Sequence, residues 1–313
     1  MRKQFLAILL ISFTNLLYSQ EFIENIITKE HKNVTGTKVS LIPAIGFTKA
    51  DNFNGFQQNE SGSSIMVVEM PTSISALKVT FTKEALLSQG IELEEIKELK
   101  INDLSAILIT GSQSANGALF SKIILVIGND NEVVLINCAY PNGFTEIGKE
   151  ITKSILSVVY LEDLEVDPLD GVDYTVNTDS TDLILAKSIA NSLIYTHDGK
   201  FPTESGSKAN LIIAKSHSRV SIEDRKLFAL NRIKQTPFDI EEIDSTVALS
   251  IDRITGYGVY AKGVSQSSGI KYELYQVILF SDHMYYIFFG STALDDKKTL
   301  EEMRLIVESF ERK

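Results

Sequence analysis

The chain has 313 residues, of which 44% are hydrophobic and 23% charged, and its formal net charge is −11 at pH 7. This length suffices for two domains with cores of their own, and the composition excludes a disordered or low-complexity protein. Because acidic side chains are in excess and no basic patch stands out, we expect neither nucleic acid nor an anionic lipid surface as a partner.

Residues 1–20 predict a secretory signal peptide. Arg2 and Lys3 form its positive start, Phe5–Ile11 its apolar centre, and Tyr18-Ser19-Gln20 its polar exit. The apolar centre is too short to cross a bilayer. The expected cleavage site near Ser19 or Gln20 has no cysteine that could be lipidated, which disfavours a lipoprotein. We therefore expect an exported, soluble protein of the periplasm or the extracellular space that is not embedded in the membrane.

Cys138 is the only cysteine, so no intramolecular disulfide can form in spite of the exported address. It lies in the apolar run Val133–Ala139. A buried thiol that acts as a small hydrophobic side chain is the favoured interpretation, and a catalytic cysteine is not indicated.

The first part of the chain has six short runs with strand character, separated by turn residues. They are Val39–Ile42, Ile65–Met70, the run with Ile96, Leu99 and Ile101, Leu104–Thr110, Ile123–Ile127 and Val133–Cys138. The nearly continuous apolar run Ile65–Met70 is typical of a strand at the centre of a sheet. Asn102-Asp103 has the chemistry of a tight turn and indicates a hairpin between Leu99–Ile101 and the run that starts at Leu104.

Two helices are predicted in the same part. One lies within Ala76–Gln89, with Thr82 as a cap, Leu86 and Leu87 as its apolar stripe and Gly90 as its end. The other closes this part of the chain, because its apolar residues recur every three or four positions along one helical face. These residues are Phe144, Ile147, Ile151, Ile155 and Val158.

A four-residue echo suggests that the chain contains two copies of one domain. Glu60-Ser61-Gly62-Ser63 returns as Glu204-Ser205-Gly206-Ser207, each time before an apolar run. Just upstream of the second echo, Asp198-Gly199 corresponds to Asn54-Gly55, which precedes the first echo. The echo itself reads as a loop tip, since an anion-binding turn would need a glycine-rich helix start and a lysine.

Later segments keep the same order. The turn Ile251-Asp252-Arg253-Ile254 corresponds to Ile101-Asn102-Asp103-Leu104, and Val277–Phe280 with Tyr285–Phe289 repeats the second hairpin. The spacing between matching residues increases gradually, as small loop insertions would produce. The order of the matches therefore predicts a duplication.

Helices are also predicted at matching places in the second copy. Ser221 with Asp224 would open one helix, and Thr299 with Glu302 would open the closing helix, each as a capping box. The expected apolar stripes are Leu227, Leu230 and Ile233 in the first of these helices, and Leu300, Met303, Val307 and Phe310 in the second.

The segment between the copies is acidic and contains no Lys or Arg. Its acidic residues are Glu162, Asp163, Glu165, Asp167, Asp170, Asp173, Asp179 and Asp182. A calcium loop is one interpretation, but the spacing of Asp167, Asp170 and Asp173 does not fit an EF-hand. A solvated linker with turns at Pro168 and Asp170-Gly171 is favoured.

The first copy resembles the PsbP-like superfamily, which includes photosystem PsbP proteins, Ran-binding Mog proteins and exported bacterial domains. The resemblance rests on Val39-Ser-Leu-Ile-Pro43, Gly46-Phe47, Gly55-Phe56, the run from Leu99 to Leu104 and the closing helix with Ser154–Ser157. It covers residues 37–160 and, more loosely, 172–311. It implies an antiparallel sheet flanked by helices and a role in binding or assembly, and it carries over no site residue.

The sequence contains no recognisable catalytic or metal-binding motif. His31, His197, His217 and His283 form no metal-type pair, and His197 beside Asp198 reads as part of a turn. Ser75-Ala-Leu-Lys78 matches the Ser-x-x-Lys pattern of penicillin-recognising enzymes, but its partner motifs are absent. We therefore predict no catalytic residues, no metal ligands and no cofactor, and we leave the ligand-binding residues unknown.

The second copy is rich in aromatic residues, which either fill a larger core or offer a binding surface. These residues are Tyr257, Tyr260, Tyr272, Tyr275, Tyr285, Tyr286, Phe288 and Phe289. The core interpretation is favoured, and the surface is kept as an alternative.

The sequence predicts an α+β protein with two tandem PsbP-like domains, each an antiparallel sheet flanked by helices in an α/β/α sandwich. The expected divisions are a signal peptide (1–20), a first domain (21–160), an acidic linker (161–181) and a second domain (182–313). The favoured function is a non-enzymatic binding or assembly module of the cell envelope, whose partner is another envelope protein or a small ligand. A carrier of small molecules or lipids and a hydrolase with a site assembled only in three dimensions remain as alternatives.

Overall fold

The computed structural model describes residues 21–313 apart from 116, 190, 217–221 and 283. The expected signal peptide, Ser221, His217 and His283 lie outside these described residues. Strands account for 47% and helices for 15% of the structure. The protein is therefore a sheet-rich α+β protein, as the many short apolar runs between turn residues predict. No described helix is long and apolar enough to cross a membrane.

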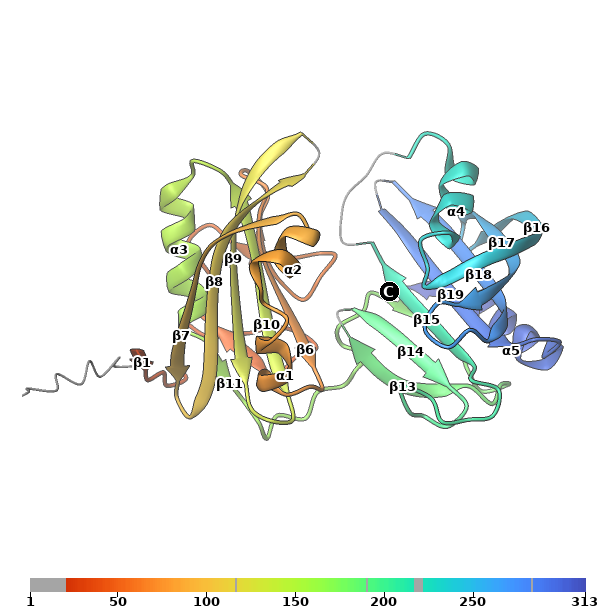
Figure 1. The fold of residues 1–313 in the computed structure, drawn as a ribbon, viewed down its shortest axis with the longest axis horizontal. Helices are drawn as coiled ribbons and strands as arrows, with labels where there is room; N and C mark the ends of the chain where they lie inside the picture. The colour runs from red at the N-terminus through yellow and green to blue at the C-terminus, as the bar shows by residue number, and fades with distance from the viewer. Residues whose placement is uncertain (1–20, 116, 190, 217–221, 283) are drawn as a thin grey trace, which may run out of the picture.

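The first half of the chain, residues 21–161, is built around one sheet (Figure 1). All neighbouring strands in it are antiparallel except β1, which runs parallel to β7. Its strands, in spatial order, are β1 (Glu21–Ile23), β7 (Ile91–Ile101), β8 (Leu104–Ala115), β9 (Ala118–Gly128), β10 (Val133–Pro141), β6 (Ser63–Met70), β5 (Gly55–Gln58) and β4 (Thr48–Lys49). A smaller sheet joins β11 (Val159–Tyr160), β3 (Val39–Leu41) and β2 (Lys32–Asn33).

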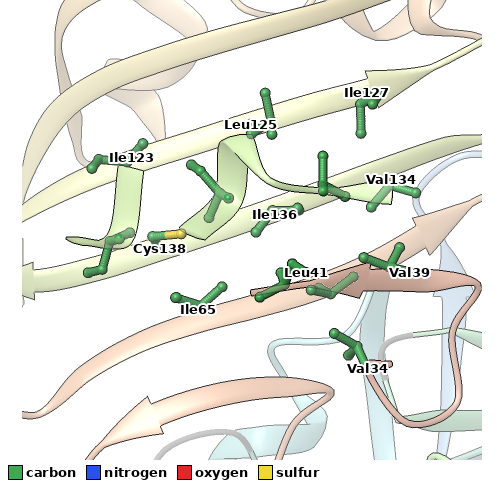
Figure 2. Close-up of a cluster of buried hydrophobic side chains, with 14 of the residues drawn as sticks. Val34, Val39, Leu41, Ile65, Ile123, Leu125, Ile127, Val134, Ile136 and Cys138 are labelled. Atoms are coloured by element: carbon green, nitrogen blue, oxygen red, sulfur yellow. The ribbon is translucent and has the colours of Figure 1, made fainter. Parts of the chain in front are cut away.

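Helices pack on both faces of this sheet. On one face, Ile151 and Ile155 of α3 (Thr145–Leu156) are fully buried in a cluster with Leu125, Ile136 and Cys138, part of which Figure 2 shows. On the opposite face a second cluster includes residues of α1 (Ile74–Lys78) and α2 (Lys83–Ser88). Because side chains alternate along a strand, the continuous apolar run of β9 supplies both clusters.

The second half, residues 172–313, has a sheet of its own. All its neighbouring strands are antiparallel. In spatial order they are β16 (Phe238–Ile251), β17 (Ile254–Ser265), β18 (Lys271–Ser281), β19 (Met284–Ala293), β15 (Asn210–Lys215), β14 (Ser192–Thr196) and β13 (Ile184–Ile189). A small sheet pairs β12 (Tyr174–Thr175) with β20 (Glu311–Arg312).

Helices also pack on both faces of the second sheet. Met303 and Val307 of α5 (Lys297–Glu308) lie in one cluster with Phe310, as the predicted apolar stripe requires. Ala229 and Ile233 of α4 (Arg225–Ile233) lie in the other. The predicted face of α4 is partly wrong, since Leu227 is 51% exposed.

The two tight turns predicted from Asn102-Asp103 and Asp252-Arg253 are present. They join β7 to β8 and β16 to β17, and Asn102 and Asp252 have φ angles of 50° and 46°. Asn and Asp tolerate this left-handed conformation better than most residues, which explains why the turns could be predicted. The buried thiol of Cys138 is also confirmed, and desolvation raises its pKa to about 12.

The helix predicted within Ala76–Gln89 is present as α2, and Thr82 caps it as predicted, accepting a hydrogen bond from the N–H of Ala85. A separate short helix, α1, precedes it because Ser73 caps a turn of its own. The starts of the other two predicted helices differ from the prediction. Asp224 is itself the N-cap of α4. The closing helix starts after Asp296, which caps the N–H of Thr299 at 3.1 Å, so the capping box of Thr299 with Glu302 is wrong.

The structure also differs from two further predictions, the match of two turn pairs and the linker. Gly55 begins β5, whereas Asp198-Gly199 follows β14, so these pairs do not occupy equivalent places. The predicted linker 161–181 is only partly a linker. Val172 and Tyr174 are buried in the cluster of the second half, and the Tyr174 hydroxyl donates to the Ile213 carbonyl at 2.9 Å.

Leu86 and Leu87 offer a matched test of this packing, because Leu86 is 2% and Leu87 56% exposed on the same helix. We expect Leu86→Ala to lower the free energy of unfolding by about 2–4 kcal/mol, since it leaves a cavity. Leu87→Ala should change it by about 0.5 kcal/mol or less. Urea unfolding measures both. Equal effects would contradict the placement of α2 on the sheet.

Candidate functional site

His31 has a structural role. Its Nδ1 lies 2.9 Å from the Thr28 hydroxyl and its Nε2 lies 3.0 Å from the carbonyl oxygen of Ser157. The Nε2 contact therefore fastens the N-terminal segment to the end of α3, and the Nδ1 contact holds the ring within that segment. The Ser-x-x-Lys match is likewise structural, because Lys78 forms an ion pair with Glu98 at 2.7 Å.

A buried lysine lies where the two halves meet. Lys215 of β15 is 7% exposed, and its ammonium group pairs with Asp173 and donates to the carbonyl oxygen of Asp51 at 3.3 Å. Tyr286 donates to the same Asp173 carboxylate at 3.2 Å. This cluster joins a loop of the first half, the connecting segment and the second sheet.

A cavity of about 110 Å³ lies beside Lys215. Asn191 also lines it, is 7% exposed, and has a buried Oδ1 without a hydrogen-bond partner among the described residues. A buried amide oxygen requires a donor, and a cavity of this size and polarity holds water. The simplest occupant is therefore ordered water that completes the polar contact between the halves.

The acidic segment does not form a calcium loop in the described structure. Lys215 already neutralises Asp173, and the Lys313 ammonium group takes the carbonyl oxygens of Leu169 and Val172. Within residues 21–313, masked positions aside, no group of three or more His, Cys, Asp or Glu could hold a metal ion. Lysine ammonium groups thus occupy the Asp173 carboxylate and two carbonyl oxygens of this segment, which a hard cation would otherwise use.

The aromatic residues of the second half mostly fill its cores. Tyr275, Tyr286 and Phe288 are 2%, 3% and 0% exposed. Tyr257, Tyr272 and Tyr285 pack against the cluster beside α4, and Tyr260 packs against the cluster beside α5. The structure therefore supports the core interpretation and offers no exposed tyrosine surface within its described part.

A groove of about 530 Å³ runs between α3 and the first sheet. Ile123, Tyr140 and Leu156 give it an apolar floor, and hydroxyl groups and charges line its walls. The polar lining comes from Glu94, Thr110, Ser121, Lys122, Thr145, Lys149, Thr152 and Lys153. This volume and this mixture of surfaces are typical of small-molecule sites.

Gly148 sets the shape of this groove. A Cβ atom at Gly148 would lie 2.5 Å from the Tyr140 hydroxyl oxygen, so only glycine lets the tyrosine lie under α3. Glycine inside a helix costs about 1 kcal/mol relative to alanine. The Tyr140 hydroxyl has no hydrogen-bond partner among the described residues. It is therefore available to a ligand.

The second half has a filled space at the same register. Thr110 pairs with Ile123 between β8 and β9, and Tyr260 pairs with Tyr275 between β17 and β18. Thr110 and Tyr260 are each the seventh residue of their strands. The rings of Tyr260 and Tyr275 stack with centroids 4.8 Å apart. At this register the first half thus has Thr110 and Ile123 where the second half has two tyrosines, and the groove is open there.

The echo in the second half lies beside His197 and Glu302, an arrangement that the sequence did not predict. His197 Nδ1 is 2.9 Å from Ser207 Oγ, and its Nε2 is 3.2 Å from Glu302 Oε2. His197 follows β14, Ser207 precedes β15 and Glu302 lies on α5. Since only tertiary packing joins these elements, the sole sequence signal was the histidine a few residues before the echo.

Asp198 holds the loop that carries this group. Its carboxylate accepts hydrogen bonds from the Glu204 N–H at 2.7 Å and from the Thr203 hydroxyl at 2.9 Å. Desolvation opposes ionisation, but these hydrogen bonds and that from the Lys200 N–H hold the pKa of Asp198 below its usual range. The loop from Asp198 to Ser207 is therefore fixed by a charged anchor.

No family model matches the chain, and no curated protein matches it. Several solved structures show weak similarity of fold. The cyanobacterial PsbP protein of Synechocystis is 13% identical, with a TM-score of 0.27 over 45% of this chain and 81% of that chain. The T6SS immunity protein TplEi of Pseudomonas aeruginosa is 9% identical, with a TM-score of 0.34 over 90% of this chain and 97% of that chain.

A chain of the Tle4–Tli4 complex is 10% identical, with a TM-score of 0.32 over 92% of this chain and 99% of that chain. Similarity at these levels does not assign the chain to a family. A PsbP protein is thus among the weakly similar structures, but the predicted PsbP-like family is not shown.

The ion pair of Lys215 with Asp173 gives a testable stability effect. Lys215→Met should lower the free energy of unfolding by about 1–3 kcal/mol, because it leaves a half-buried carboxylate without its cation. Lys271→Met is the control, since its pair with Glu241 is exposed and should contribute about 0–1 kcal/mol. Urea unfolding of both variants measures the difference. An equal effect of the two would refute the structural role of Lys215.

Proposed function

We propose that this protein is an exported binding module of the cell envelope, composed of two PsbP-like domains in tandem. We further propose that the groove along α3 of the first domain carries a small organic ligand. The observation that carries this proposal is the contrast between an open groove in the first half and two stacked tyrosines at the same register in the second.

The order of strands supports the tandem duplication. Read from the hairpin edge, the first sheet runs β7-β8-β9-β10-β6-β5-β4 and the second runs β16-β17-β18-β19-β15-β14-β13. The chain visits these positions in the same sequence in both halves, with α3 and α5 after the last hairpin. One additional strand, β1, covers the edge of the first sheet.

Two hydrogen bonds recur at equivalent places and support the same proposal. The hydroxyl of Ser157, just after α3, accepts the N–H of Ile42 at 2.9 Å, and that of Ser309, just after α5, accepts the N–H of Asn177 at 2.7 Å. The N–H of Leu161 donates to the carbonyl oxygen of Lys38, and the N–H of Lys313 donates to the carbonyl oxygen of Asp173, both at 2.8 Å. Such long-range contacts are improbable products of independent folds.

Charge around the groove favours an organic anion as the ligand. Lys149 and Lys153 lie one turn apart on α3, and Glu94 is the single carboxylate among the residues that line the groove. Lys149 also forms an ion pair with Glu146 at 2.8 Å. Desolvation lowers the pKa of Lys122, so an anionic partner nearby would stabilise its charged form. An apolar floor with cationic walls suits a small carboxylate or phosphate ester.

Thr110→Tyr tests the groove, because it places in the first half the residue that fills the second. Native mass spectrometry of the protein purified from the envelope should show one small molecule bound per chain. The Thr110→Tyr variant should carry no such molecule. Ser105→Tyr, on the exposed part of the same strand, is the matched control and should keep the ligand. Absence of any bound molecule, or equal occupancy in Thr110→Tyr, would contradict the proposal.

Separate expression tests the two domains. Residues 21–161 and 172–313 should each fold, because each half has buried clusters of its own. Each fragment is expected to unfold cooperatively in urea and to give dispersed amide NMR spectra. If either fragment remains unfolded while the full chain folds, the two halves are parts of one cooperative unit and not domains in tandem.

A further inference from the structure

Three side chains in the second half meet in a hydrogen-bonded row. Ser207 Oγ lies 2.9 Å from His197 Nδ1, and His197 Nε2 lies 3.2 Å from Glu302 Oε2. The side chain of Glu302 is 7% exposed and that of His197 is 22% exposed. Ser207 is half-buried on a turn. The row thus leads from a buried acid to a half-buried hydroxyl.

Glu302 determines which nitrogen of His197 holds the proton. Lys298 Nζ lies 3.4 Å from Glu302 Oε1 and forms an ion pair with it. A carboxylate only accepts hydrogen bonds, so Nε2 of a neutral His197 carries the proton and donates it to Glu302. The lone pair of Nδ1 then faces Ser207 and accepts its hydroxyl proton. This is the arrangement of a serine, a general base and an orienting acid.

The turn around Ser207 supports the same direction of hydrogen bonding. Ser207 Oγ accepts from the Ala209 N–H at 3.3 Å, and the Ser205 hydroxyl lies 3.3 Å away. With Ser205 as the donor in this contact, the Ser207 hydroxyl proton points to His197 Nδ1. The N–H groups of Gly206 and Ser207 donate to no other described residue, and Lys208 has a φ of 51°. Unpaired N–H groups beside a nucleophile can stabilise an oxyanion, and strained backbone gathers at functional sites.

The first half shows that the ESGS turn does not need a histidine for its structure. There, Ser61 lies 2.7 Å from Ser63, and the Ser61 hydroxyl also lies 2.6 Å from Gln58 Oε1. A glutamine amide completes the hydrogen bonding but cannot take up a proton. His197 therefore adds proton-transfer chemistry to a turn that closes without it in the other half.

We propose that Ser207, His197 and Glu302 form a hydrolytic centre that acts on small esters. This inference goes beyond the proposed ligand groove, does not rest on it, and departs from the expectation of a non-enzymatic protein. Ser207 is the nucleophile, His197 is the general base and acid, and Glu302 is a positioning residue.

The reaction proceeds in two balanced steps. Ser207 Oγ attacks the ester carbonyl carbon, its proton passes to His197 Nδ1, and the leaving alcohol departs with that proton, so that an acyl ester of Ser207 remains. Water then attacks this ester, and its proton reaches Ser207 Oγ through Nδ1. The carboxylic acid leaves and the serine is restored. Glu302 accepts a hydrogen bond from the Nε2–H group throughout and stabilises the transient imidazolium.

The decisive test is covalent labelling of the full-length protein with a fluorophosphonate probe. We expect one probe per chain by intact mass, and peptide mapping should place it on Ser207. Hydrolysis of p-nitrophenyl acetate should fall at least about 100-fold in Ser207→Ala and His197→Gln, since a positioned base contributes on that order or more. Mapping of the wild-type label needs no variant, so misfolding of a variant leaves the test valid.

The matched control is Ser63→Ala, which removes the equivalent serine of the first half and should leave labelling and hydrolysis unchanged. Glu302→Gln should lower kcat by about tenfold or more while KM stays constant, because the substrate does not touch Glu302. A purely structural role of Glu302 would instead lower the melting temperature and leave kcat intact. An unlabelled wild-type protein, or a label on any residue other than Ser207, overturns the proposal.

Discussion

The two-sided burial of the central strands determines the rest of this structure. Side chains of β9 alternate between two clusters, with Leu125 fully buried on one face and Val126 fully buried on the other. Such a strand is stable only if both faces are covered, so helices must pack on each side of the sheet. The same constraint acts in the second half, where Val277 and Ile278 of β18 face different clusters. A single helix cannot cover a whole sheet face, and the groove beside α3 is the part left uncovered.

The elements predicted best are those determined by neighbours in the sequence. The central strands follow from apolar runs, and the turns at Asn102 and Asp252 follow from residues that tolerate a positive φ. Helix starts were less predictable, because two caps can lie within one turn of each other. Asp296 and Thr299 are both good caps, and only the path of the preceding chain selects Asp296.

The candidate sites were not predictable because each depends on contacts between distant segments. The groove takes its shape from Thr110 and from Gly148, which admits the Tyr140 ring, yet neither residue is unusual in its own segment. Glu302 was assigned to a capping box, whereas α5 starts earlier and turns that carboxylate towards His197. Lys215 likewise meets Asp173 only after the connecting segment has packed on the second sheet.

If the halves descend from one domain, their differences are more informative than their similarities. The hydroxyls of Ser157 and Ser309 hold equivalent backbone positions, so selection for the fold alone explains them. The contrast of Thr110 with Tyr260 has no such explanation, since the fold accepts either an open groove or stacked tyrosines. The histidine beside only one of the two ESGS turns is equally unnecessary for folding. Positions where one scaffold tolerates two solutions are free to acquire function, and both candidate sites lie at such positions.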